Sequence, residues 1–399
     1  MRVDLLDPET FSQGHPVQLY QWLQDNHPVY WHEEKNGPGF WALTRYEDVA
    51  EVGRQPHLYS SQPTVMLDDP PPDSPMSDSS QRQMMLMMDP PQHTHFRKII
   101  SREFTRGPAS ALRPRVAELS AKIIDQVIDR GQCEFVSEVA GELPSYVIAE
   151  LTGIPLEDGR ELYKLTEIIH TAADALEPGA QGRAIGEMFA YAKQVYTNKL
   201  NQPTDDLASQ IVHAEVEGVK LDELDFQLFF MLLIDAGGDT TRNLLAGGLF
   251  ELINHPDLLH DWQHHRSEEL DHSARDELLR KVCPVIYFRR TALQDVELHG
   301  QTIKAGDKVV RYFGAANHDP RQFENPTELK LDRFPNEHIA FGTGTHVCLG
   351  QHIARVEIDC MLNEILKRLT DFRMPEPPQW LASNFISGIR SMPMEFRAR

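Results

Sequence analysis

The residue type best suited to chemistry in this chain is a cysteine near its C-terminus, Cys348. It lies in residues 341–350, which read FGTGTHVCLG. A thiolate that binds haem iron needs backbone N–H groups directed at its sulfur, and glycines let the backbone approach closely. Gly342, Gly344 and Gly350 provide three such positions. The pattern therefore predicts a thiolate ligand to haem iron, with Phe341 packed against the ring or the sulfur.

Two other interpretations of this segment stay open at the level of the residues. The first is a glycine-rich turn before a helix, with an incidental cysteine. The second is a zinc site formed by His346, Cys348 and His352. A structural zinc site usually has four ligands, often with paired cysteines, and no fourth is obvious nearby. We therefore rank zinc well below haem.

Residues 225–253 predict one long helix with an unusual centre. Two adjacent glycines, Gly237 and Gly238, cost roughly 2 kcal/mol relative to alanine in mid-helix. Asp239 and Thr240 follow in an otherwise apolar helix, where an unpaired carboxylate is costly. We expect a local opening of the helix that holds a ligand or water, with Asp239 and Thr240 as a proton-delivery pair. The alternative is a helix–helix contact through small residues, with Asp239 exposed.

Haem carries two propionates, which require Arg or His partners. His93 and Arg97 are four residues apart and so share a helix face. Arg290 and His346 are the other candidates, although each of the four could singly be a surface charge.

Glu277 and Arg280 are one helical turn apart. On a surface such a pair contributes only tenths of a kcal/mol. They lie in the chain between the glycine-containing helix and Cys348, and this position strengthens an otherwise weak motif.

The remaining pattern predicts a mainly α protein with a small β region. Residues 28–45 favour a hairpin and residues 295–310 a second short β region, while most of residues 93–369 has helical spacing. Residues 62–83 are proline-rich and predict an irregular loop. The methionines that follow it, among them Met84 and Met87, are either flexible core residues or an adaptable wall over a ligand.

Composition excludes several classes of function. The net charge of −21 argues against nucleic-acid or anionic-membrane partners. No signal peptide is evident, and the longest apolar run, residues 228–234, is too short to span a bilayer. The four cysteines show no C-x-x-C spacing and are expected to be free, as in a reducing compartment. We expect a cytoplasmic monomer without a membrane anchor.

Several of these motifs together resemble one family. Phe341-x-x-Gly344-x-x-x-Cys348-x-Gly350 resembles the haem-binding signature of the cytochrome P-450 superfamily. Residues 236–240, AGGDT, are similar to its oxygen-activation helix, and residues 89–97, DPPQHTHFR, to its bacterial propionate-binding helix. Glu277, Arg280 and Arg333 resemble its glutamate–arginine triad.

The resemblance extends over nearly the whole chain and implies a cytochrome P-450 fold. This fold is mainly α, a triangular helical prism with haem between a long central helix and the cysteine loop. We therefore expect a single domain over residues 1–399, although the length alone suggested two or three. The β-rich part is expected mainly from residues 28–45, 295–310 and 384–398.

The resemblance also implies cofactors and roles. The cofactor is haem b, with Cys348 as the axial thiolate and O2 as co-substrate. The other residues implied at the cofactor are His93, Arg97, Arg290, His346, Phe341, Gly342 and Gly350.

The implied reaction is insertion of one oxygen atom from O2 into a C–H bond of a hydrophobic substrate. Residues 285–298 and 383–390 resemble members that act on sterol side chains and methyl-branched lipids, so a steroid, terpenoid or branched lipid is expected. The alternative is a peroxide-using or non-hydroxylating haem-thiolate enzyme of macrolide or terpene biosynthesis; Asp239 and Thr240 argue against peroxide use. The expected pocket residues are Met84, Met87, Ile234, Ala236, Gly237, Val285, Ile286, Phe288 and Phe385.

The resemblance to the soluble bacterial branch implies electron supply by a ferredoxin and a ferredoxin reductase. Residues 97–115 contain six basic residues and one acid, a local inversion in an acidic chain. This segment is either a solvated basic helix or a dock for an acidic ferredoxin. The docking residues expected are Lys98, Arg102, Arg106 and Arg113.

Overall fold

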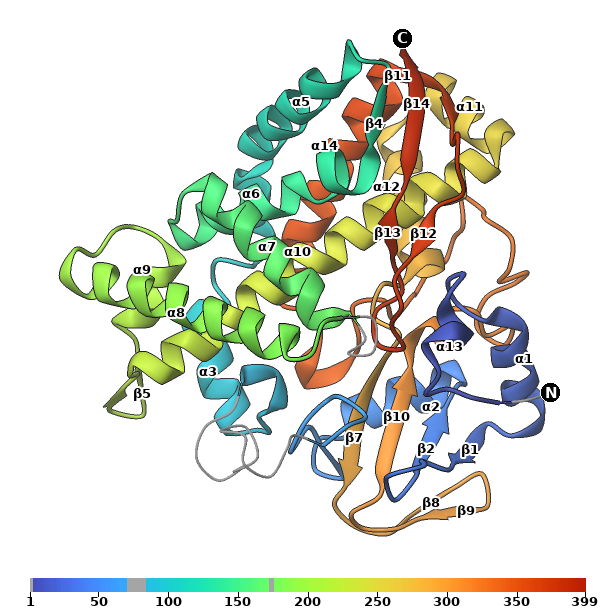
Figure 1. Cartoon of the computed structure of the whole chain (residues 1–399). Helices are drawn as coiled ribbons and strands as arrows, with labels where there is room; N and C mark the ends of the chain where they lie inside the picture. Colours follow the sequence, from blue (N-terminus) through green and yellow to red (C-terminus); the bar gives the residue numbers. More distant parts are fainter. Residues whose placement is uncertain (1–2, 70–83, 172–175) are drawn as a thin grey trace.

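The computed structural model describes residues 3–69, 84–171 and 176–399. Helices form most of the molecule, and the largest sheet lies at one corner, beside the N-terminal helix (Figure 1). The first helices are α1 (Val17–Asn26), α2 (Tyr46–Arg54), α3 (Gln92–Ile100), α4 (Arg106–Ala111), α5 (Arg113–Ile128), α6 (Glu142–Thr152) and α7 (Leu156–His170). They are followed by α8 (Ala180–Asn201), α9 (Leu207–Val212), α10 (Glu223–Asn254), α11 (Pro256–His264), α12 (Glu268–Val282), α13 (Phe313–Asn317) and α14 (Gln351–Arg368).

The long helix α10 confirms the prediction for residues 225–253. Asp222 caps it, since its carboxylate accepts hydrogen bonds from the N–H groups of Leu224 and Asp225. Buried residues occur on all sides of α10, which is typical of a helix in the middle of a domain. It lies in contact with α6, α7, α8, α12 and α14.

The expected opening at the centre of α10 is not observed, because the helix is continuous through these residues. A Cβ on Gly237 would lie 3.4 Å from Ile148 of α6, and one on Gly238 would lie 3.4 Å from Tyr163 of α7. Both are ordinary van der Waals distances, so packing by itself does not require glycine at either position.

The largest sheet has the strand order β1-β2-β10-β7-β3. The predicted hairpin of residues 28–45 is confirmed as the antiparallel pair β1 (Val29–His32) and β2 (Phe40–Leu43). β10 (Lys308–Tyr312) runs parallel to β2 and antiparallel to β7 (Tyr287–Ala292). β7 was not predicted, because its YFRRTA sequence has two central arginines in place of an apolar alternation. At the edge, β3 (Tyr59–Ser60) pairs with β7.

The other strands form small pairs and one three-stranded sheet. The predicted β region at residues 295–310 contains β8 (Val296–Leu298) and β9 (Gln301–Ile303) in addition to β10. The prediction for residues 384–398 is confirmed only from Ile389 onward, since residues 384–388 are not in a strand. The remaining strands are β4 (Gln132–Glu134), β5 (Glu215–Val216), β6 (Val219–Lys220), β11 (Leu369–Arg373), β12 (Gln379–Trp380), β13 (Ile389–Ser391) and β14 (Pro393–Ala398).

Most of the predicted proline-rich loop, residues 70–83, lies outside the described residues. The four cysteines are free, and Cys133, Cys283 and Cys360 are buried. Within the part of the chain that is described, no helix is both long and apolar enough to cross a membrane.

Glu277 and Arg280 form a buried pair, so the interpretation as a surface pair is wrong. Both residues are fully buried, and two nitrogens of Arg280 donate to the Glu277 carboxylate at 2.8 Å. Arg333 completes the triad with a bond of 2.9 Å. Burial acts to raise the pKa of Glu277, but the hydrogen bond and charge of Arg280 outweigh it and lower the pKa. The triad fixes α12 to the segment that leads into the Cys348 loop.

Candidate functional site

Cys348 lies between a short 3-10 turn, Gly344–His346, and the first turn of α14. Its N–H donates to the Phe341 carbonyl at 2.8 Å, which closes the loop. Gly344 has φ +75°, and a Cβ there would lie only 1.8 Å from the Gly53 carbonyl oxygen, so no larger residue fits. Burial raises the pKa of the Cys348 thiol, while hydrogen bonding from the backbone of Gly350 opposes the rise. Of the three glycines expected near the sulfur, Gly350 therefore acts as a backbone donor, together with Gln351.

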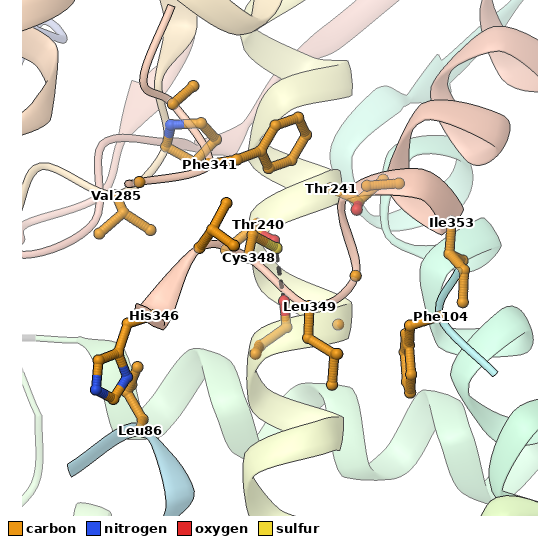
Figure 2. Close-up of a pocket in the computed structure, with 18 of the residues that line it drawn as sticks. Leu86, Phe104, Thr240, Thr241, Val285, Phe341, His346, Cys348, Leu349 and Ile353 are labelled. Carbon is orange, nitrogen blue, oxygen red and sulfur yellow. Dashed lines mark hydrogen bonds between the residues drawn. The ribbon is translucent and has the colours of Figure 1, made fainter. Parts of the chain in front are cut away.

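The loop forms one wall of a large internal cavity. Its empty volume, including the opening to solvent, is about 1560 Å³. Figure 2 shows Cys348 and Phe341 on the loop that passes alongside α10, where Thr240 lies. Gly342 and Gly350 line the same cavity.

The four predicted cationic residues, His93, Arg97, Arg290 and His346, all line this cavity. His93 is only 2% exposed, and its Nδ1 atom has no hydrogen-bond partner in the described part of the chain. Burial, reinforced by the charges of Arg97 and Arg290, lowers the pKa of His93 to about 4. A buried polar atom without a partner indicates that a ligand supplies one.

The arginines of this group form no salt bridge to a carboxylate in the described part of the chain. Arg311 of β10, which was not predicted, lines the cavity as well, with bonds to the Val49 carbonyl and to Thr343. Asp89 acts on Arg290 through its charge, but none of the described carboxylates forms an ion pair with Arg97, Arg290 or Arg311. Burial lowers the pKa of Arg290 to about 10. Buried cations without an anion fit a ligand that brings its own carboxylates, as haem does.

The helix α10 presents Thr240, but not Asp239, to the cavity. The Thr240 hydroxyl donates to the Ala236 carbonyl at 2.9 Å. Asp239 is 1% exposed, so the alternative in which it is exposed is wrong. Its carboxylate accepts from Arg242 at 2.7 Å and from Asn243 at 3.1 Å. The predicted acid and alcohol therefore lie on different faces of the helix.

The predicted pocket residues divide into two groups. Ala236, Gly237, Val285 and Phe288 line the cavity. The described lining does not include Met84, Met87, Ile234, Ile286 or Phe385, and these predictions are corrected.

The corrected residues are adjacent in sequence or space to lining residues. Met84 and Met87 are core residues, and Met85 and Leu86 between them line the cavity. Phe385 packs behind the lining, with its ring 6.0 Å from that of Phe288.

Several lining residues were missed, among them Leu232 and Leu233 of α10 and Val147 and Ile148 of α6. The leucines lie three to four residues before Ala236, so helical spacing from the predicted pocket could have found them. Val147 and Ile148 carry no local signal, because only the packing of α6 on α10 brings them to the cavity.

The zinc alternative is not supported. No group of three His, Cys, Asp or Glu side chains that could hold a metal ion occurs among the described residues. His346 and Cys348 both line the cavity, but the His346 ring points away from the sulfur (Figure 2).

The basic segment of residues 97–115 lies next to the Cys348 loop. Lys98, Arg102, Arg106 and Arg113 are exposed. Phe104, between two of the arginines, is buried and lines the cavity near Ile353 (Figure 2). Arg113 also forms an ion pair of 2.9 Å with Asp359 of α14. The predicted docking residues thus lie on the outer side of a cavity wall.

Comparison with known proteins agrees with this geometry. The family model named Cytochrome P450 matches residues 178–384. A steroid C26-monooxygenase of Rhodococcus jostii is 34% identical over 99% of this chain and 84% of its own length. The chain belongs to the cytochrome P450 family. A putative cytochrome P450 126 of Mycobacterium tuberculosis is also 34% identical, over 99% of this chain and 97% of its own.

Solved structures of the family have the same fold. A Mycobacterium marinum cytochrome P450 in complex with pseudoionone matches with a TM-score of 0.91 and 33% identity, over 99% of both chains. A Bacillus megaterium P450 in complex with testosterone matches with a TM-score of 0.85 and 29% identity, over 97% of this chain and 98% of the other. This P450 is a monooxygenase that uses haem iron and O2.

Proposed function

We propose that this P450 binds haem b with Cys348 as the axial thiolate. The propionates are held by His93, Arg97, Arg290 and His346, and the ring contacts Phe341, Gly342 and Gly350. The observation that supports this assignment is a single cavity lined by the cysteine loop, by α10 and by the buried arginines Arg290 and Arg311, with the unpartnered Nδ1 atom of His93 beside them. Haem, when bound, supplies the activation of O2.

The protein's own groups position the ligands of the cavity and deliver protons to them. The Thr240 hydroxyl uses its proton in the bond to Ala236, so its lone pairs are free to accept a hydrogen bond from a group in the cavity. Asp239 is the acid of the proposed proton-delivery pair. It would reach the cavity side of α10 only when its bonds to Arg242 and Asn243 open, so these two residues control its availability.

The proposed substrate is a steroid, or another hydrophobic terpenoid or branched lipid, that is hydroxylated at an unactivated C–H bond. Much of the described lining is apolar, with side chains such as Leu232, Ile148 and Val285, which suits a hydrophobic ligand. Similarity to a steroid C26-monooxygenase and to a P450 solved with testosterone supports the steroid class.

The proposed electron donors are a ferredoxin and its reductase. Lys98, Arg102, Arg106 and Arg113 would form the docking surface, because they are exposed cations beside the wall that separates the Cys348 loop from solvent. Complementary potential would steer an acidic partner to this face.

One spectrum tests the cofactor assignment. The reduced protein with bound carbon monoxide should show the red-shifted Soret band of thiolate ligation, and Cys348→Ser should abolish it. Cys133→Ser, at a buried free cysteine elsewhere in the chain, is the matched control and should retain the band. A normal band in Cys348→Ser would overturn the assignment. A panel of steroids, terpenoids and branched lipids, screened for displacement of iron-bound water by the spin-state shift, then tests the substrate class.

A further inference from the structure

A pair of histidines on α11 lies outside the described lining of the Cys348 cavity. His260 and His264 are both exposed, while Leu259 and Trp262 of the same helix are buried. Residues four positions apart lie one above the other on a helix face. The centroids of the two imidazole rings are 4.1 Å apart, and the ring planes are tilted by 32°. The helix therefore brings two strong metal ligands together at the surface.

The inner side of α11 is fixed to the rest of the molecule. The indole nitrogen of Trp262 donates to the Asp271 carboxylate of α12 at 2.7 Å. The side-chain amide of Gln263 donates to the Leu369 carbonyl at 2.8 Å. The helix also contacts α10 and α14. The backbone that carries the two histidines is therefore held in place, so a bound ion does not have to order it.

One contact selects the ring nitrogen that His264 offers to a ligand. Its Nδ1 atom lies 2.7 Å from the carbonyl oxygen of His260. A carbonyl only accepts, so Nδ1 carries the proton and the neutral ring has its lone pair on Nε2. Histidines that bind metal ions commonly donate their other ring N–H to a carbonyl or carboxylate in this way. His264 is thus set up as an Nε2 ligand.

The separation of the rings fits one metal ion. Two nitrogens that share a zinc ion, each at about 2.1 Å, are at most about 4.2 Å apart. A centroid separation of 4.1 Å brings ring atoms into this range. Because His260 is exposed, its ring is free to rotate until one of its nitrogens faces Nε2 of His264.

Exposed carboxylates lie beside the pair without completing the site. Asp257 is three residues before His260, and Asp261 is three residues before His264, so each shares a helix side with one imidazole. Their charge, in a chain of net charge −21, favours a cation. No group of three His, Cys, Asp or Glu side chains that could hold a metal ion occurs among the described residues. The site thus has two protein ligands, and water fills the remaining positions of a bound ion.

A purely structural role accounts for only one of the two histidines. The contact of Nδ1 with a carbonyl in the last turn of α11 helps to cap the helix, and this explains His264. The cap does not use the side chain of His260. The remaining alternative for the pair is a solvated polar face on which neither ring binds an ion.

We propose that His260 and His264 form a surface site for one divalent transition-metal ion, which binds a nitrogen of each ring and cross-links one turn of α11. Imidazole suits Zn2+, Ni2+ and Cu2+, and a given nitrogen site binds Cu2+ most tightly. The unfolded chain does not hold the two rings together, so the ion favours the folded protein. This site is independent of the haem assignment.

Calorimetric titration of the haem-loaded protein with ZnCl2 tests the site. One Zn2+ should bind per chain. The affinity should fall by at least about 10-fold in His260→Asn and in His264→Asn, since even the loss of an outer-shell partner costs about 10–100-fold. His265→Asn, at an exposed histidine next to the pair, is the matched control and should bind as the parent does. Zinc should raise the unfolding temperature of the parent and of the control, and EDTA should reverse the rise.

A further variant adds a ligand instead of removing one. Asp257→His places an imidazole on the same side of the helix as His260 and should tighten zinc binding by at least about 10-fold. An affinity no higher than that of the parent would contradict an ion held on this side of α11.

Two other results would overturn the proposal. One is the absence of zinc binding by the parent protein. The other is equal affinity in the parent, His260→Asn and His264→Asn, which would show that zinc binds surface histidines without specificity. Loss of the Soret band in a parent protein that still binds zinc would instead refute the haem assignment.

Discussion

Burial determines the protonation state of single histidines in this protein. His15 and His318 lie together in the interior, with ring centroids 6.1 Å apart. The Nε2 atom of His15 lies 2.9 Å from the Cys283 carbonyl, and the Nδ1 atom of His318 lies 2.8 Å from the Gly314 carbonyl. Burial lowers the pKa of both rings, and His15 adds to the effect at His318. Both are neutral in the folded protein at neutral pH.

We predict that acid destabilises the fold through these two residues. In the unfolded chain these two histidines bind protons near pH 6.5, whereas in the folded chain they do so only at lower pH. Their contribution to the free energy of unfolding is therefore fully present above pH 6.5 and is lost as the pH falls below it. The loss approaches about 1.4 kcal/mol per pH unit for each histidine. Urea unfolding between pH 7.5 and 5 measures it, and His318→Gln should flatten the dependence. An equally steep slope in that variant would exclude His318 as a source.

At the scale of elements, a line of charged side chains joins α7 to α10. Arg242 of α10 is fully buried, forms ion pairs with Asp239 and with Glu167 of α7, and lies 5.0 Å from the Tyr163 ring centroid. One turn away, His170 of α7 pairs with Asp235 at 2.6 Å. Burial opposes protonation of His170, but the charge and hydrogen bond of Asp235 prevail and raise its pKa to about 9. These contacts hold α7 against the helix that forms the cavity wall.

We predict that Arg242→Met destabilises the protein by about 3–5 kcal/mol, because it leaves the buried Asp239 carboxylate without its cation. The double variant Arg242→Met/Asp239→Asn should recover part of this loss, since no buried charge remains. The free energy of unfolding in urea measures both. Lys193→Met, at an exposed ion pair of α8, is the control and should cost below about 1 kcal/mol. Equal losses in the single and double variants would show that packing, rather than charge, is responsible.

At the scale of the whole molecule, charge is unevenly distributed. The chain carries a net charge of −21, yet the segment beside the Cys348 loop is basic. The helix α4 of this segment lies against α14, which follows the proposed axial ligand. A partner bound to this face would therefore deliver electrons close to Cys348. The rest of the acidic surface would repel an acidic partner.

We predict that Arg102→Glu or Arg106→Glu slows reduction by a ferredoxin without altering substrate affinity. Added salt should slow reduction of the parent protein and have less effect on the variants, because screening removes the same attraction. Stopped-flow reduction measures the rate, and the spin-state titration measures substrate affinity. Arg183→Glu, an exposed arginine on α8, is the control. Reduction rates equal to those of the parent would contradict docking at this face.

The sequence by itself determined those features that depend on local residue types. It predicted the fold, the glycine-flanked Cys348 loop, the hairpin of residues 28–45, the long helix at α10 and the four Arg and His residues that line the cavity. Motif spacing is sufficient for these, because a helix face or a tight loop follows from positions a few residues apart. The strand β7 was missed, because its arginines are buried by contacts that its own segment does not encode.

Only the tertiary structure decided which side of each element meets the cavity. A shift of one residue moves a side chain by about 100° around a helix, so Ile234 and Asp239 turn away while Ala236 and Thr240 line the cavity. The same packing buries Glu277 with Arg333, 56 positions later. It also brings Glu357 to Thr241 across 116 positions. Contacts between distant segments depend on how helices pack, and neither segment alone carries that information.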